Sequence, residues 1–136
     1  MIVLDTHALI WWVDNPDRLS QTARHAIDSE FDAGDAARIL ISAITAWEIA
    51  MLINKGRLSL SMDLEVWLDL VADIDGLRFI PMDREIAVAA TRLPGEFHKD
   101  PADRIIVSTA RKYSAPVVTG DEKILKYTHV KQFGSQ

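Results

Sequence analysis

The sequence contains no cysteine. This absence excludes disulfide scaffolds, thiolate nucleophiles, zinc–thiolate sites and iron–sulfur clusters. It is typical of a protein of the reducing cytoplasm, which is the location that we expect. Glycine and proline are also scarce, with 6 and 5 residues, so the composition is not that of a disordered or low-complexity chain.

Long apolar runs are missing as well. The longest stretch without a charged residue runs from Ile39 to Trp47, well short of the ~20 apolar residues that a membrane-spanning helix needs. The N-terminal residues lack the basic start and the cleavage site of a signal peptide. We therefore expect no association with a membrane.

An excess of positive charge is the third absence. Lys and Arg number 15 against 20 Asp and Glu, which gives a net charge of −5. A protein that holds nucleic acid mainly through its phosphates is usually basic, so an electrostatic clamp is not expected. An acidic protein can still act on phosphodiesters where its acids hold metal ions. Glycine-rich loops of the GxxxxGK[ST] or GxGxxG type are absent, so nucleotide-hydrolysing and dinucleotide-binding functions lack support.

Short apolar runs alternate with longer helical patterns along the 136 residues. This alternation predicts one α/β domain over residues 1–136, with helices on both faces of a mostly parallel sheet. Strands are expected at 2–4, 39–41, 79–80 and 116–119. Helices are expected after the N-caps Ser20, Asp83 and Asp100, extending to about residues 31, 93 and 113. A further helix is expected over 63–73, where apolar residues form one stripe.

Four acidic residues stand in otherwise apolar surroundings. Asp5 follows an expected strand directly, and Asp121 follows another with only Gly120 between them. Glu48 is the only charged residue in a long apolar stretch, and Asp103 lies near the start of an expected helix. The carboxyl ends of parallel strands face one edge of a sheet, where ligands bind. All four carboxylates could therefore meet at that edge.

Each acid also has a simpler explanation. Asp103 and Asp121 could cap helices or interact with the helix dipole. Asp5 could accept backbone N–H bonds in a turn, and Glu48 could pair with an arginine. Capping does not explain Glu48 and explains Asp5 poorly, so the four acids together favour a site.

A cluster of four carboxylates requires a hard cation. Ligands that offer only oxygen favour Mg²⁺ or Mn²⁺ over zinc. The natural chemistry of such a centre is metal-assisted hydrolysis of a phosphodiester. The residues predicted to be both metal ligands and catalytic residues are Asp5, Glu48, Asp103 and Asp121.

Other polar and aromatic residues flank these acids. Thr6 and Thr119 could orient carboxylates or water. Arg104 could contact a phosphate or pair with an acid. His7 and His98 neighbour the acids, although the histidines show no spacing typical of metal ligands. The tryptophans at helical spacing are interpreted as core or interface residues rather than as a platform for bases.

Four segments together resemble PIN-domain ribonucleases, and more narrowly the VapC-type toxins of bacterial and archaeal toxin–antitoxin pairs. They are IVLDTHALIWW at 2–12, ISAITAWEIAMLINKGRL at 41–58, HKDPADRIIVSTA at 98–110 and VVTGDEKI at 117–124. The stretches RLSQTA and IPMDREIAVAATRLP also resemble this family, so the resemblance covers nearly the whole chain.

The resemblance implies roles for particular residues. The four acids of the family match, in chain order, Asp5, Glu48, Asp103 and Asp121. The family's hydroxyl two residues before its fourth acid matches Thr119. Asp100, in the DPADR segment, is a secondary candidate that could also be a helix cap. Position 7 is often Asn or Ser in the family and is His7 here, so the resemblance assigns it no role.

The resemblance also implies a fold and an activity. The fold would be a three-layer α/β/α sandwich, and the activity a Mg²⁺-dependent cleavage of RNA that arrests growth. The partners would be a cognate antitoxin, which inserts a segment near the active site and often offers an Arg to the carboxylates, and a second copy in a homodimer or larger assembly.

Three alternatives remain open at this point. A phospho-receiver domain would need an acidic neighbour of Asp5 and an Asp near Ser42, and the sequence has neither. A phosphatase with an Asp nucleophile would need a second Asp at position 7. A PIN-like scaffold that binds RNA or protein without cutting is compatible with the sequence, although all four acids are present.

Overall fold

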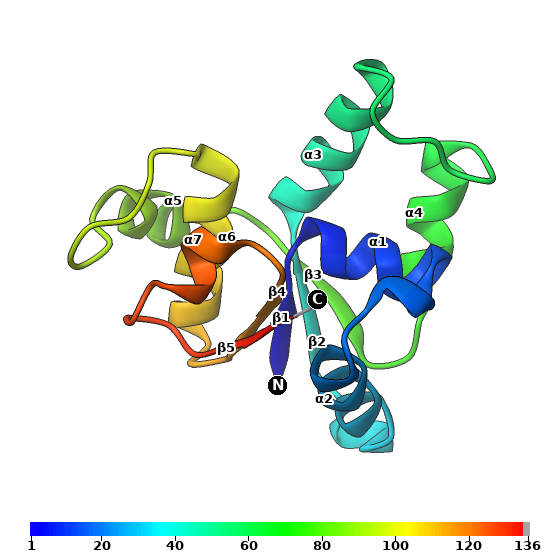
Figure 1. The fold of residues 1–136 in the computed structure, drawn as a ribbon, viewed down its shortest axis with the longest axis horizontal. Coiled ribbons are helices and arrows are strands. Elements are labelled where there is room, and N and C mark those ends of the chain that lie inside the picture. The colour runs from blue at the N-terminus through cyan, green and yellow to red at the C-terminus, as the bar shows by residue number, and fades with distance from the viewer. Residues whose placement is uncertain (135–136) are drawn as a thin grey trace.

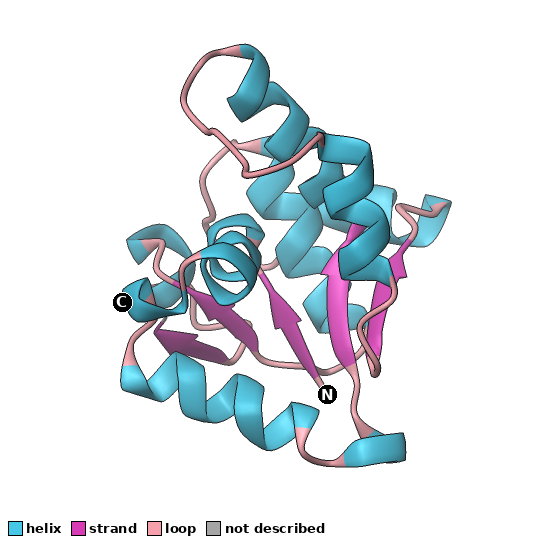
Figure 2. Ribbon diagram, turned by 90° about the vertical axis from the view of Figure 1, so that its right-hand side faces the viewer, coloured by secondary structure: helices cyan, strands magenta, loops and turns pink. Residues whose placement is uncertain are grey.

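Five parallel strands form the centre of the protein, whose computed structural model describes residues 1–134. The strand order is β3-β2-β1-β4-β5, and Figure 2 shows the strands fanned by the twist usual in such sheets. Their bounds are β1 Ile2–Leu4, β2 Ile39–Ser42, β3 Leu77–Ile80, β4 Val117–Thr119 and β5 Gln132–Gly134.

Helices cover both faces of the sheet (Figure 1). One side carries α1, α2 and α4, and the other carries α5, α6 and α7, whereas α3 extends beyond the end of β2. This arrangement confirms the three-layer α/β/α fold. The helices are α1 Thr6–Asp14, α2 Gln21–Phe31, α3 Ala43–Asn54, α4 Leu64–Ala72, α5 Arg84–Thr91, α6 Pro101–Lys112 and α7 Glu122–Leu125, with 3₁₀ turns at Pro16–Arg18 and Gly34–Ala36.

Two apolar cores lie on opposite faces of the sheet. Leu4 of β1 and Ile41 of β2 pack into the core beneath α1, α2 and α4. Val3 and Leu40, one residue earlier on the same strands, pack into the core beneath α5, α6 and α7. Side chains alternate between the faces of a strand, so a strand covered on both sides must be apolar throughout. This explains the short unbroken apolar runs.

Helix starts follow the predicted capping residues. Ser20, Asp83 and Asp100 each accept a hydrogen bond from the backbone N–H three residues later, at 3.0, 2.8 and 3.0 Å. These bonds satisfy N–H groups that have no partner within the helix. The capping pattern therefore predicted the starts of α2, α5 and α6 correctly.

Several elements were not predicted, among them α1, α7 and β5, and the strands β2 and β3 are longer than predicted. The helix α1 follows β1 with only Asp5 between them. The strand β3 begins at Leu77 rather than at residue 79. The edge strand β5 contains one large apolar residue, Phe133, and forms by pairing with β4 rather than from a pattern of its own.

Over residues 1–134, no helix combines the length and the apolar character that crossing a bilayer requires.

Gly76 lies at the close approach of two chain segments. It precedes β3 with a φ of +84°, and its carbonyl accepts a hydrogen bond of 2.8 Å from the N–H of Ile39. A Cβ atom on Gly76 would lie 2.6 Å from the Cβ of Ala37. Both the backbone conformation and the lack of space therefore require glycine.

We expect Gly76→Ala to lower the free energy of unfolding by about 2–4 kcal/mol, because left-handed strain and steric overlap add. Gly56→Ala is the matched control, since Gly56 has a φ of +69° but nothing within 4 Å of an added Cβ. The control should lose only about 1 kcal/mol. Urea unfolding of both variants measures the difference, and equal losses would contradict the steric explanation.

Candidate functional site

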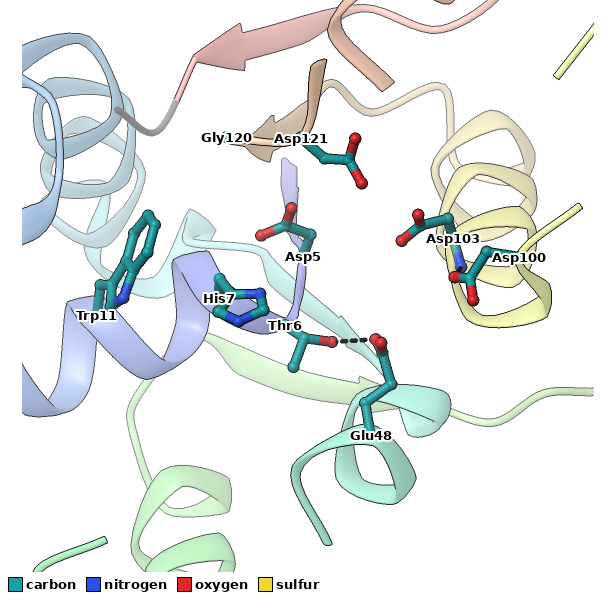
Figure 3. Close-up of a pocket in the computed structure, with 9 residues that line it drawn as sticks. All are labelled: Asp5, Thr6, His7, Trp11, Glu48, Asp100, Asp103, Gly120 and Asp121. Atoms are coloured by element: carbon teal, nitrogen blue, oxygen red, sulfur yellow. Dashed lines mark hydrogen bonds between the residues drawn. The ribbon is translucent and has the colours of Figure 1, made fainter. Parts of the chain in front are cut away.

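A cavity of about 390 Å³ lies at the carboxyl edge of the sheet. Figure 3 shows acidic side chains from several elements directed toward one another there. All four predicted acids line this cavity, as does Asp100. The full lining is Asp5, Thr6, His7, Trp11, Glu48, Asp100, Asp103, Gly120 and Asp121.

Asp5 is the most deeply buried of these acids, with 7% of its surface exposed. It caps α1, because its Oδ1 accepts a hydrogen bond of 2.9 Å from the N–H of Ala8. Its Oδ2 accepts a bond of 2.5 Å from the Thr119 hydroxyl. Burial raises the pKa of Asp5 to about 6, against the opposing effect of the Thr119 bond. Hydrogen bonds therefore hold both oxygens in place, and burial favours the protonated form of the carboxyl.

Thr119 connects two of the acids. Its hydroxyl donates to Asp5 and accepts a bond of 3.0 Å from the backbone N–H of Asp121. Because β1 and β4 are neighbours, with Leu4 paired to Val118, the residues that follow the two strands lie side by side. The predicted orienting role of Thr119 therefore has a geometric basis.

Glu48 reaches the cavity from α3 and is held by Thr6. The Thr6 hydroxyl donates a bond of 2.5 Å to Oε1 of Glu48 and lies 3.2 Å from the hydroxyl oxygen of Thr45. Burial raises the pKa of Glu48, although the Thr6 bond acts in the opposite direction. No arginine within residues 1–134 forms an ion pair with Glu48, so the alternative of an Arg–Glu pair is not what the structure shows.

Asp103 lies in the first turn of α6 with acids on two sides. Its pKa is raised to about 8, first by burial and then by the negative charges of Asp100 and Asp121. Asp100 and Asp121 also cap α6 and α7, with Asp121 accepting a bond of 2.8 Å from the N–H of Lys123. Asp100 and Asp121 therefore each cap a helix and also line the cavity.

The cavity lining as a whole carries five carboxylates and no lysine or arginine. Carboxylates that lie this close cannot all be ionised without a compensating positive charge. The raised pKa values of Asp5, Glu48 and Asp103 arise first from burial and then from this repulsion. The arrangement fits a divalent cation, which would supply the missing charge and accept the oxygen ligands.

Arg104 points away from the cavity. Its guanidinium donates hydrogen bonds to the carbonyl oxygens of Ala90, Phe97 and His98, at 2.8, 3.0 and 3.1 Å. These contacts differ from both roles that the sequence suggested, a phosphate contact or a pair with an acid. Arg104 instead fixes the segment that leads into α6.

Sequence reasoning left other lining residues without a role. His7 and Trp11 form one wall, on the same face of α1, with ring centroids 5.8 Å apart. Their spacing of four residues is the helical signal that could have placed them together. His98 is not among the lining residues, but Nε2 of its ring lies 3.0 Å from Oδ2 of Asp103.

Comparisons with known proteins give concordant matches. The family model of the PIN domain matches residues 2–130. Ribonuclease VapC22 of Mycobacterium tuberculosis is 32% identical over 128 residues, which are 94% of this chain and 92% of that protein. The crystal structure of VapBC2 from Rickettsia felis, bound to a DNA fragment from the promoter, has a TM-score of 0.70 at 16% identity, with 100% of each chain covered. The DNA-bound VapBC of Salmonella typhimurium has a TM-score of 0.65 at 23% identity, with 97% of each chain covered.

The raised pKa values predict how stability depends on pH in the absence of divalent cations. The native state holds protons on Asp5 and Asp103 up to pH values of about 6 and about 8, whereas the ordinary value is 3.8. The unfolded chain therefore ionises first, and the free energy of unfolding falls as the pH rises across this range. We expect Asp103→Asn to flatten the fall and to raise the stability at pH 8.

Asp69→Asn serves as the control, because it removes one negative charge from an exposed position on α4. Urea unfolding between pH 5 and 8 in EDTA measures all three proteins. Parallel pH profiles for the wild type and Asp103→Asn would show that ionisation of Asp103 does not lower the free energy of unfolding.

Proposed function

Since the chain belongs to the PIN domain family, we propose that it is a metal-dependent endoribonuclease and the toxin of a toxin–antitoxin pair. The similarity to a ribonuclease along almost the entire chain supports RNA as the substrate. The observation that carries the proposal is the convergence of Asp5, Glu48, Asp103 and Asp121 on one cavity whose lining contains no lysine or arginine. We place the activity in the cytoplasm, where RNA and a protein partner occur together.

The donor set supports Mg²⁺ or Mn²⁺ as the cofactor. Carboxylate oxygens are the ligands that these hard cations prefer. Asp5, Glu48, Asp103 and Asp121 would hold the ion, with Asp100 at the rim of the cavity as a secondary candidate. A bound divalent cation would supply the positive charge that attracts an RNA phosphate and stabilises charge developing at the scissile bond.

Hydrogen bonds from neighbouring residues orient the carboxylates that would bind the cation. Thr119 and the N–H of Ala8 fix the two oxygens of Asp5, and Thr6 fixes Glu48. These bonds limit the reorganisation that ligand binding would otherwise require. Burial and the neighbouring acids raise the pKa of the Asp103 carboxyl to about 8, and a bound divalent cation would favour loss of its proton.

Two surfaces support protein partners. A second cavity, of about 800 Å³, lies between α1, α4 and residues 58–62 and shares Trp11 with the acidic cavity. Its apolar lining suits an amphipathic segment of an antitoxin, from which an arginine could reach the carboxylates. Val88 on α5 and Met82 just before it are large apolar residues that are exposed, and they support a homodimer or a larger homo-oligomer.

We expect the purified, antitoxin-free protein to cleave tRNA or another structured RNA with Mg²⁺ or Mn²⁺, and not with EDTA. Asp103→Asn should lower the cleavage rate by about 100-fold or more, because even the outer partners of metal ligands are worth about 10–100-fold. Cleavage is measured on gels of end-labelled RNA, with Asp69→Asn as the surface control.

Cleavage at an unchanged rate by Asp103→Asn would refute the assignment of this site. A wild-type protein that binds divalent cations and RNA but cuts no RNA would instead be a binding scaffold. Cleavage that survives in EDTA would contradict a metal-dependent reaction.

A further inference from the structure

His98 stands beside the acidic cluster in an unusual contact. The Nε2 atom of its ring lies 3.0 Å from Oδ2 of Asp103, and the two side chains are only 20% and 17% exposed. Nε2 is nevertheless buried without a hydrogen-bond partner among the described residues. The nitrogen and the oxygen are therefore neighbours whose bonding directions do not point at each other.

A third group completes the arrangement. His98, Asp103 and Asp121 each offer one ligand atom, and these atoms all lie within 4.8 Å of one another. Ligands on opposite sides of one ion are about 4 Å apart, because each bond to the metal is about 2 Å long. A nitrogen and two carboxylate oxygens that lie this close are suited to a shared cation.

The position of the imidazole is fixed by its surroundings. Arg104 holds the carbonyls of Phe97 and His98, and the ring of Phe97 packs edge-on against that of His98, with centroids 4.5 Å apart. Phe97 in turn contacts Tyr127, whose hydroxyl donates a bond of 2.6 Å to the carbonyl of Pro94. The segment before α6 is thus tied at several points, so the ring is oriented before any ligand arrives.

We propose that His98 is a nitrogen ligand of the cation site and that it biases the site toward Mn²⁺ over Mg²⁺. The inference rests on the proposed function, because it concerns the same cation. A neutral imidazole adds a donor without adding negative charge to a cluster that already holds five carboxylates. Nitrogen donors suit first-row transition metals, whereas Mg²⁺ demands oxygen and retains its waters.

Pulsed electron paramagnetic resonance of the full chain with MnCl₂ tests the nitrogen bond directly, without any turnover. We expect ¹⁴N modulation of the Mn²⁺ signal, and we expect it to change to the ¹⁵N pattern when the protein is made with ¹⁵N-labelled histidine. This measurement on the wild type needs no variant to fold.

Variants then identify the histidine. His98→Gln should abolish the nitrogen signal and weaken Mn²⁺ binding by about tenfold, with little change in Mg²⁺ binding by calorimetry. The matched control is His7→Gln, because His7 lines the same cavity but lies outside the three-residue cluster. The control should keep the signal.

The outcomes separate this inference from the proposed function. Mn²⁺ that binds without histidine nitrogen modulation, or modulation that disappears only in His7→Gln, would overturn the role of His98 and leave the carboxylate site intact. Failure to bind Mn²⁺ at all would overturn both. A normal nitrogen signal in a protein that cuts no RNA would count against the nuclease alone.

Discussion

Electrostatic repulsion within one small cavity is the constraint around which this structure is arranged. Five carboxylates line a cavity of about 390 Å³, and none of the lining residues is a lysine or an arginine. Such a cluster lowers the stability of the cation-free fold, as the raised pKa values of Asp5, Glu48 and Asp103 show. The two apolar cores, one on each face of the sheet, offset this cost.

The topology of the sheet explains why acids distant in sequence come together. Asp5 and Asp121 follow two strands that pair directly, although residues 5 and 121 are 116 positions apart along the chain. Glu48 follows the strand on the other side of β1, one helical turn into α3, and Asp103 enters from the first turn of α6. Two threonines then fix the orientation of Asp5 and Glu48. The backbone sets the place of each acid, and neighbouring hydroxyls set its direction.

The sequence allowed much of this arrangement to be predicted, for identifiable physical reasons. Two-sided burial produces unbroken apolar runs, so β1, β2 and β4 were found, and carboxylates in apolar surroundings are costly enough to stand out, so the four acids were found. The edge strand β5 escaped because pairing with β4 forms it. The contacts of Arg104 and His98 escaped because both depend on how the segment before α6 folds back. No periodicity encodes such a contact.

Asp103 and Arg104 are adjacent in the sequence but have different structural roles. The two side chains are opposite in charge, yet one faces the acidic cavity while the other is occupied by three main-chain carbonyls. The guanidinium fork can satisfy acceptors in several directions at once, which a lysine ammonium on its flexible stem does less well. Substitution of Asp103 therefore changes the charge of the cavity, whereas substitution of Arg104 removes the hydrogen bonds that hold the segment before α6.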